Sequence, residues 1–378
     1  MGLFTLPPKI PQADLNLDLF LKGDNLETTI RRPRRTLAAE WFPQSGIQLT
    51  WPHAGTDWAE DLPEVTACYL RMAFEIAMRE TLLVVTPEVD EVRTLLQKHL
   101  PRQAMERVAL AECPTNDTWA RDHSFLTVLG TNGPELLDFR FNGWGGKFEA
   151  QLDNAINRNL YENGWVKGTY IDCLDFELEG GSIETDGCGT LLTTTRCLLN
   201  PNRGHGRDKQ QIELLLGERL GVNHFLWLEH GELIGDDTDA HIDTLARLCP
   251  EQTIVYTQSK DPEDPQHKEL DLMEKQLQSF RTAENDSYRL IPLPVPDPVW
   301  DENGERLPAT YANFLVMNEV VLYPTYRQPE KDETARQALL KAFPRLDLVG
   351  IDCRVLIRQH GSLHCATMQY PRGVLQQK

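Results

Sequence analysis

A helix, a strand and a polar loop follow one another five times along this chain of 378 residues, and this repeat constrains the fold more than any other feature. Apolar periodicity predicts helices at about residues 89–99, 149–163, 209–220, 267–283 and 332–343. A strand is predicted after each helix, at residues 107–112, 169–176, 224–228, 288–293 and 346–351. Helices and strands that alternate in this way indicate the α/β class.

Each predicted strand is followed by a loop that carries a polar residue. In chain order these residues are Asp122, Glu179, His241, Asn313 and Cys365, separated by 57, 62, 72 and 52 positions. Such a period usually means that one supersecondary unit is used several times around a shared core. If the units are arranged radially, the five loops converge on one axis. A core made of polar loops is energetically costly unless it is a site, so the repeat predicts one constellation.

The last of these loops holds a candidate nucleophile. Cys365 follows a turn signal at Gly361 and Ser362 and comes directly after His364. A cysteine at the mouth of a loop can be an activated nucleophile. It can equally be a small buried apolar side chain, because structural cysteines are usually inert.

Four residues of these loops make a chemically coherent set. Asp122, His241, Asp243 and Cys365 supply two carboxylates, a base and a thiol, and cysteine with histidine is an arrangement for covalent catalysis. Two acids would raise the pKa of the thiol and repel an acyl oxyanion, which argues against a protease. A guanidinium offers carboxylates a planar fork of N–H donors, and its charge would help to stabilise the thiolate. The set therefore predicts attack on the central carbon of a guanidino group.

The same residues also have structural interpretations. Asp122 follows Arg121, and the two could form a surface ion pair. His241 and Asp243 alternate on what reads as a strand, so that both would point to one face and could form a structural pair. Asn313 by itself is typical of a turn.

Two glycine-rich stretches are less specific. Glu179–Gly181 could be a tight turn, and residues 141–147 lack the Lys-Ser/Thr ending of a phosphate-binding P-loop, which favours a turn that is structural or lines a ligand. No cluster of His, Cys or Asp has the spacing of metal ligands. We predict neither a metal nor another cofactor.

Composition limits the partners. The net charge is -19, which argues against nucleic acid or an anionic membrane as the main partner and is compatible with a small cationic guanidino substrate. Residues 1–36 are rich in proline and charge and end in the basic cluster Arg31–Arg35, which indicates a solvated N-terminal arm. Residues 37–378 are predicted to form a single catalytic domain.

The cysteines and the N-terminus indicate a cytoplasmic location. None of the eight cysteines forms a C-x-x-C pair, and scattered cysteines in a chain of this length are typical of reduced thiols. Residues 1–8 lack the charged start and apolar run of a signal peptide. No apolar stretch approaches the roughly 20 residues of a membrane span. The sequence is compatible with a homo-oligomer and does not specify its size.

Six motifs occur in a fixed order over roughly residues 40 to 372. They are Asn116–Asp122, Phe141–Gly146, Glu179–Ile183, Leu198–Arg203, Asp239–Asp243 and His364–Cys365. In these motifs the chain resembles the agmatine deiminase and bacterial-type peptidylarginine deiminase family, within the guanidino-group-modifying superfamily. The resemblance implies a five-bladed α/β-propeller (pentein) with pseudo-fivefold symmetry, which matches the five units.

The resemblance also implies roles for individual residues. Cys365 would attack the guanidinium carbon, and His241 would protonate the departing ammonia. His241 would then activate water to hydrolyse an S-alkylthiouronium intermediate. Asp122 and Asp243 would hold the guanidinium nitrogens. The predicted substrate-binding residues are Trp119, Asp117, Glu179, Gly180, Gly181 and Asn313.

Our first functional hypothesis is hydrolytic deimination of agmatine to N-carbamoylputrescine and ammonia, a reaction of polyamine biosynthesis. A cytosolic chain favours a small metabolite over secreted protein substrates. Asp117, Glu184 or another acid would receive the distal ammonium, and Glu184 stands where the family often has histidine. The alternative enzyme is a deiminase of peptidyl- or free arginine, giving citrulline. A hypothesis outside the enzymes is a non-catalytic guanidino- or amine-binding module. Retention of all four catalytic candidates argues against that.

Overall fold

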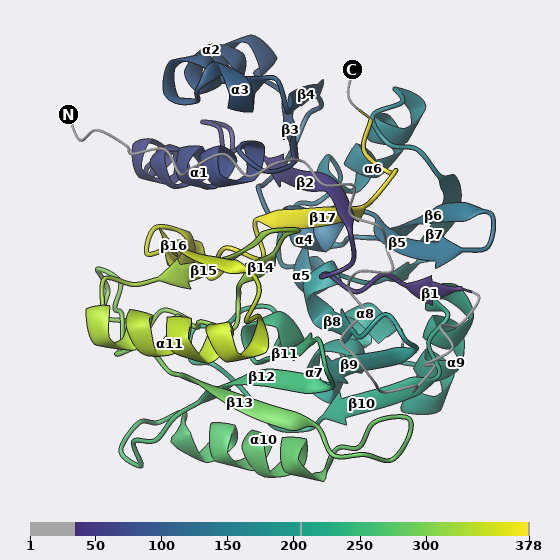
Figure 1. The fold of residues 1–378 in the computed structure, drawn as a ribbon, viewed down its shortest axis with the longest axis vertical. Coiled ribbons are helices and arrows are strands. Elements are labelled where there is room, and N and C mark those ends of the chain that lie inside the picture. The colour runs from purple at the N-terminus through teal and green to yellow at the C-terminus, as the bar shows by residue number, and fades with distance from the viewer. Residues whose placement is uncertain (1–34, 205, 377–378) are drawn as a thin grey trace. The chain divides into compact units, whose positions relative to one another are not determined.

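The computed structural model describes residues 35–204 and 206–376, which form a mixed α/β fold (Figure 1). Most of the arm predicted over residues 1–36 therefore lies outside the described residues. Thr36, the last residue of that prediction, pairs with Leu129 and is already part of a sheet. Among the described residues, no helix combines the length and the apolar character needed to cross a membrane.

The described residues contain five sheets that share one plan. Two antiparallel strands are followed by a helix and by a third strand that lies parallel to the second. Four of these ββαβ units are continuous in sequence. The fifth joins the two ends of the domain, because its first strand comes from the C-terminus and pairs with a strand near the N-terminus.

The units follow one another along the chain. The first contains β5 (Leu126–Gly130), β6 (Gly133–Arg140), α6 (Asp153–Glu162) and β7 (Thr169–Glu177), with β1 (Thr36–Leu37) added at its edge. The second contains β8 (Ile183–Thr185), β9 (Thr190–Thr194), α9 (Lys209–Leu220) and β10 (His224–Leu228). The third contains β11 (Ala246–Cys249), β12 (Thr253–Gln258), α10 (His267–Ser279) and β13 (Arg289–Pro294).

The last two units complete the domain. The fourth contains β14 (Leu315–Val316), β15 (Val320–Thr325), α11 (Pro329–Ala342) and β16 (Asp347–Asp352). The fifth contains β17 (Thr367–Pro371), β2 (Gln44–Thr50), α1 (Leu62–Ala77) and β3 (Thr81–Thr86), with β4 (Val108–Glu112) added through α2 (Val89–His99) and α3 (Arg102–Met105). Helices α1, α10 and α11 each contact a strand of their own sheet and a strand of a neighbouring one.

Sequence periodicity located the helix and the last strand of most units, and the structure changes one grouping. It did not place the strands of the antiparallel pairs, which are β5, β6, β8, β9, β11, β12, β14, β15 and β17. The predicted helices at 89–99 and 209–220 and the predicted strand at 224–228 agree with α2, α9 and β10 residue for residue. The helix that corresponds to the others in the repeat is α1, however, and not the predicted helix at 89–99. That helix and β4 extend one sheet beyond the shared unit.

The polar loops occupy equivalent places in the five units. Each leads into the first strand of an antiparallel pair, and several contain a short helical turn. These turns are α4 (Ala120–His123) before β5, η2 (Gly180–Ser182) before β8 and η3 (Ile242–Thr244) before β11. Asn313 lies just before β14 and Cys365 just before β17. The remaining short elements are α5 (Gly143–Gly146), α7 (Thr195–Leu198), α8 (Pro201–Gly204) and η4 (Leu356–Gln359).

The predicted strand alternation of His241 and Asp243 is wrong. Asp239 and Ala240 have positive φ angles of 65° and 64°, which end any extended run, and η3 begins at Ile242. Oδ2 of Asp236 accepts the backbone N–H of Ala240 at 2.7 Å and so holds this bend. The two residues approach the site from a tight turn, and short-range alternation could not reveal this because the bend depends on left-handed residues outside the pair.

Helix α9 illustrates how a helix is defined at both ends and packed on one side. Asp208 and Gln211 form a capping box at its start, and Gly221 ends it with a φ of 69°. Leu216 faces the core and is fully buried, whereas 74% of Leu214 is exposed. The same residue type thus lies in opposite environments two positions apart.

This contrast predicts a stability difference. Leu216→Ala should lower the free energy of unfolding by about 2 to 5 kcal/mol, because it leaves a cavity in a packed core. Leu214→Ala, the matched control on the same helix, should change it by less than about 0.5 kcal/mol. Urea unfolding followed by circular dichroism measures both. Equal losses in the two variants would contradict the packing described for α9.

Candidate active site

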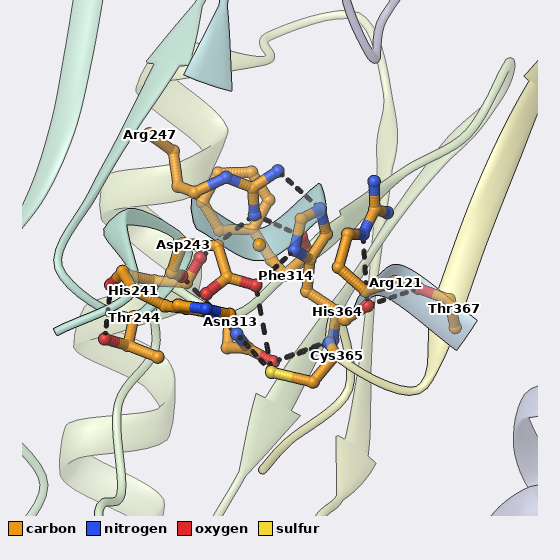
Figure 2. Close-up of polar contacts among 12 residues, drawn as sticks. Arg121, His241, Asp243, Thr244, Arg247, Asn313, Phe314, His364, Cys365 and Thr367 are labelled. Carbon is orange, nitrogen blue, oxygen red and sulfur yellow. Dashed lines mark hydrogen bonds and ion pairs between the residues drawn. The ribbon is translucent and has the colours of Figure 1, made fainter. Parts of the chain in front are cut away.

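Polar residues from the separate loops meet in one place, as the repeat predicts (Figure 2). The Nδ2–H of Asn313 donates to the Sγ of Cys365 at 3.2 Å, and this Sγ lies 3.7 Å from Oδ2 of Asp243. On the other side of the group, Nδ1 of His241 lies 3.8 Å from Oδ1 of Asp122. All five side chains are buried. The predicted thiol, base and two carboxylates therefore share one small volume.

Asn313 organises the nucleophile through both ends of its amide. Its Oδ1 accepts the backbone N–H of His364 at 2.8 Å and that of Cys365 at 3.2 Å, while its Nδ2–H donates to the thiol. Two backbone contacts and one side-chain contact from a single rigid group fix the turn before β17. Asn313 was predicted to bind substrate, and the structure places its amide against the thiol of Cys365.

The environment of Cys365 favours the protonated thiol. Burial raises the pKa of Cys365 well above its ordinary value, and the negative charges of Asp243 and Asp122 raise it further. This confirms the electrostatic part of the sequence argument. A cation placed between the acids and the thiol would reverse the effect, because it would stabilise the thiolate that the acids oppose.

The environment of His241 favours its charged, protonated form. Burial disfavours the charged imidazolium, but the carboxylate of Asp122, the side chain of Cys197 and the charge of Glu179 outweigh it and raise the pKa of His241 to about 10. The imidazole is therefore protonated at neutral pH and is suited to act as an acid. Asp122 is held in turn by the indole N–H of Trp144, which donates to its Oδ2 at 2.9 Å.

Gly181 brings the second loop into contact with this group. Its backbone N–H donates to Oδ1 of Asp122 at 2.9 Å. A Cβ at this position would lie 2.7 Å from Nδ1 of His241, 2.9 Å from Oδ1 of Asp122 and 3.1 Å from Oδ2 of Asp243. A side chain would therefore displace the base and both acids. The close approach of backbone to the site explains the glycine here.

A cavity of about 230 Å³ opens onto Cys365. Its wall includes Trp119 and Trp144, and it carries four carboxylates and one guanidinium, which belong to Asp57, Asp117, Asp122, Asp237 and Arg358. Burial raises the pKa of Asp117 to about 6, so that this carboxyl is still largely ionised at neutral pH. The guanidinium of Arg358 is bound to Asp61 at 2.5 Å and to Glu64 at 2.8 Å. The cavity is therefore predominantly acidic.

Several residues considered for substrate binding or catalysis do not line the cavity, namely Glu179, Gly180, Gly181, Glu184, His241, Asp243 and Asn313. Both side-chain oxygens of Glu179 accept Nε–H of Arg203, at 2.7 and 2.9 Å, and Glu179 does not line the cavity. Gly180 packs against the carbonyl oxygen of Arg121, also outside the cavity. Glu184 forms a buried ion pair with Arg247. Glu184 is thus unavailable for a distal ammonium, whereas Asp117 and Trp119 line the cavity as predicted.

Several residues of the site were not assigned from the sequence. They are Glu40, Asp57, Trp144, Asp237, Arg247, Arg358 and His364. Trp144 and His364 stand in the motifs that carry the family resemblance, which was the available signal for them. Glu40 and Arg247 lie 207 positions apart and meet only through the fold.

Two groups of buried side chains have the donor types of a cation site among the described residues. One consists of Glu179, Cys197 and His241, and the other of Glu40, Glu184 and His364. Each group already contains a buried guanidinium on its carboxylates, from Arg203 in the first and from Arg247 in the second. Arginine therefore supplies the positive charge in both groups, and the absence of a metal stays a prediction.

Comparison with known proteins identifies the family of the chain. The family model for Porphyromonas-type peptidyl-arginine deiminases matches residues 36–371. The chain belongs to this family. The motifs of the sequence thus identified the family correctly.

Three similar proteins represent the relatives. A solved structure from Porphyromonas gingivalis, provisionally called an arginine deiminase, is 48% identical with a TM-score of 0.85 and covers 90% of this chain and 100% of that one. A cysteine-to-serine variant of C. jejuni agmatine deiminase with substrate bound is 35% identical with a TM-score of 0.82, covering 90% and 97%. The agmatine deiminase of Pseudomonas syringae pv. tomato is 31% identical over 373 residues, covering 92% of this chain and 98% of its own.

The raised pKa of Cys365 predicts a pH profile for its alkylation. The rate with the neutral reagent iodoacetamide should be low at pH 7 and should rise with pH, because only the thiolate reacts. Asp243→Asn should increase the rate at pH 7 to 8, since it removes a charge that raises the thiol pKa. Mass spectrometry of the Cys365 peptide reports the rate, with Asp271→Asn on the exposed side of α10 as the control. A flat profile would contradict the description of a protonated thiol.

Proposed function

We propose that this member of the family is a hydrolase that deiminates agmatine to N-carbamoylputrescine and ammonia through a covalent cysteine intermediate. The observation that carries the proposal is a buried thiol beside two carboxylates and a protonated histidine, at the end of an acidic cavity. Carboxylates raise the pKa of a nearby thiol and would therefore slow its attack on a neutral substrate. A substrate that is itself a cation offsets their charge. A guanidinium supplies that charge at the carbon that is attacked.

The proposed reaction begins with binding of the guanidinium. Asp122 and Asp243 accept its N–H groups, and Oδ1 of Asp243 is a buried acceptor without another hydrogen-bond partner among the described residues. The bound cation lowers the pKa of Cys365, whose proton passes to solvent, and the thiolate forms a C–S bond at the central carbon. The imidazolium of His241 protonates one nitrogen of this adduct, which leaves as ammonia and yields a cationic S-alkylthiouronium. Neutral His241 then takes a proton from water as that water attacks the same carbon. Collapse of the second adduct breaks the C–S bond, and the remaining hydroxyl proton passes to the departing thiolate, which leaves neutral N-carbamoylputrescine and restores the thiol.

The distal end of the cavity favours agmatine over free arginine. Asp57, Asp117 and Asp237 offer carboxylates to the primary ammonium of agmatine. The same charges would repel the α-carboxylate of free arginine, and Arg358, the one guanidinium in the wall, is already bound by Asp61 and Glu64. Relatives called agmatine deiminases, one with substrate bound, support the same choice.

Deimination of peptidyl- or free arginine to citrulline is the second candidate. The description of the family model and the 48% identity to the P. gingivalis protein support it. A peptide carries no α-carboxylate at the arginine itself, so the acidic wall does not repel it. The wall also gives a neutral backbone nothing to pair with, which makes peptidylarginine the weaker choice.

We also propose that the five units surround a common axis as the blades of a five-bladed α/β-propeller (pentein) with pseudo-fivefold symmetry. The shared ββαβ order and the placement of one polar loop before the first strand of each antiparallel pair support this. The helices that contact neighbouring sheets are consistent with it.

The product suggests the setting of the reaction. N-carbamoylputrescine is one hydrolysis away from putrescine, so the proposed activity belongs to polyamine biosynthesis. Reduced buried cysteines and a thiol nucleophile suit the cytoplasm. The proposed partner is the small cationic substrate rather than nucleic acid or a membrane, in keeping with the net charge of -19.

A substrate panel tests the assignment. Ammonia release should be fastest with agmatine, slower with arginine peptides blocked at both ends, and slowest with free arginine, because only agmatine places an ammonium against the distal acids. Coupled glutamate dehydrogenase reports the rates as kcat/KM. Release from blocked arginine peptides but not from agmatine would reverse the order of the two candidates.

Replacement of the nucleophile gives a second prediction. Cys365→Ser should abolish ammonia release, by at least about 1,000-fold, because a hydroxyl is not ionised in this acidic environment. The buried side chain keeps nearly the same volume, so the free energy of unfolding should change by less than about 1.5 kcal/mol. Turnover by this variant close to the unmodified rate would exclude the covalent mechanism.

A further inference from the structure

His364 is a buried histidine next to the nucleophile that the proposed chemistry does not use. Its ring does not line the cavity, and only 1% of the residue is exposed. Nδ1 lies 2.8 Å from Oδ2 of Asp243, and Nε2 lies 2.7 Å from Oε2 of Glu40 and 3.0 Å from Nη2 of Arg247. Figure 2 shows the ring beside Asp243 and Arg247, and the thiol of Cys365 lies near the same Oδ2 of Asp243 that the ring contacts.

We propose that His364 is a positioning residue, which acts on the reaction by holding Asp243, while Glu40 and Arg247 hold His364 from behind. This inference rests on the proposed function, because it concerns how Asp243 receives a guanidinium. It assigns a task to a residue that neither touches the substrate nor reaches the reacting atoms.

The direction of the hydrogen bond follows from the partners. Although burial favours its neutral form, His364 and the nearby positive charges lower the pKa of Asp243, which is therefore an acceptor only. Nδ1 of His364 consequently carries the hydrogen and donates it to Oδ2 of Asp243. Nε2 either donates to Glu40 or accepts from Arg247, and the contact to Asp243 is the same in both cases.

This donor decides which oxygen of Asp243 faces which group. Oδ2 receives the Nδ1–H of His364 and is the oxygen that lies 3.7 Å from Sγ of Cys365. Oδ1 is left without a hydrogen-bond partner among the described residues. The carboxylate thus cannot rotate without losing a charge-assisted hydrogen bond, and the buried Oδ1 remains the acceptor for an N–H of the guanidinium.

The groups behind His364 form a buried network. Nη2 of Arg247 donates to Oε2 of Glu40 at 2.7 Å, and the backbone N–H of Val316 donates to Oε1 of Glu40 at 2.6 Å. Nη2 of Arg121 is 3.8 Å from the same Oε2 and has no hydrogen-bond partner among the described residues. Because both ring nitrogens of His364 have polar partners, rotation of the imidazole would break buried contacts.

Arg247 links this network to the thiol by a second path. Its Nη1 donates to the carbonyl oxygens of Ala312 at 3.1 Å and of Phe314 at 2.6 Å. These carbonyls flank Asn313, whose amide fixes the turn of Cys365. One guanidinium therefore supports both the histidine that holds Asp243 and the asparagine that holds the nucleophile.

Two conservative substitutions separate positioning from simple packing. His364→Asn keeps an amide N–H near the place of Nδ1, within reach of Asp243, and loses the contact to Glu40. His364→Gln extends its amide toward the place of Nε2 and loses the donor to Asp243. Both variants are neutral and polar, so each is the control for the other.

Agmatine deimination and thermal unfolding are measured for the two variants. His364→Gln should lower kcat/KM by about 10- to 100-fold, the range found when the outer hydrogen-bond partners of metal-ligating side chains are removed. His364→Asn should stay several-fold closer to the unmodified enzyme at a similar unfolding temperature. Equal losses in both variants, or no loss in either, would overturn the inference.

A second readout does not need turnover. Chloroacetamidine is a cation and chloroacetamide is its neutral analogue, and their alkylation rates at Cys365, each relative to a small free thiol, report how well the acids hold an amidinium. The ratio of cation to neutral reagent should fall toward one in His364→Gln and remain high in His364→Asn. Equal ratios in the two variants would refute the inference. An unmodified enzyme that releases no ammonia from any guanidino compound would instead refute the proposed function, while the alkylation ratios would still decide the role of His364.

Discussion

The carboxylate of Asp243 is the contact on which the other features of the site depend. Its Oδ2 accepts the Nδ1–H of His364 and lies 3.7 Å from the thiol of Cys365. Together with Asp122 it puts negative charge beside a nucleophile that must itself become negative. Ionisation of the Cys365 thiol is therefore unfavourable until a cation enters the site. This condition couples substrate recognition to activation of the thiol, because one positive group satisfies both.

The site has different electrostatic effects on His241 and Cys365, although both stay protonated. Asp122, Cys197 and Glu179 outweigh burial and keep His241 protonated, whereas burial and the two acids keep Cys365 protonated. In the proposed mechanism, the site before substrate binds thus holds a protonated His241 that can serve the leaving group and a Cys365 thiol that is not yet ionised. Such an arrangement limits reaction of the thiol with neutral molecules, since these bring no charge to offset the carboxylates.

Buried arginines form a second layer around this group. Arg203 is bound to Glu179 and Asp239, and Arg247 is bound to Glu40 and Glu184. Each guanidinium has low exposure and several hydrogen bonds, the condition under which a buried ion pair specifies a geometry. Glu40, just after β1, and Arg247, in β11, show that the layer ties distant units of the repeat to one centre.

The sequence by itself determined the class of fold, the five units, the family and the four candidate side chains that meet in the buried site. Local signals were sufficient for these, because helix periodicity, turn residues and motif order are properties of neighbouring positions. The cap at Asp208 and the end of α9 at Gly221 are examples. Only the tertiary structure decided that Asn313 serves the thiol, that Glu179 and Glu184 are occupied by arginines, and that Glu40 supports His364 from 324 positions away. Pairing of charges across such separations depends on which side chains become buried together, and burial is a property of the packed chain and not of any segment.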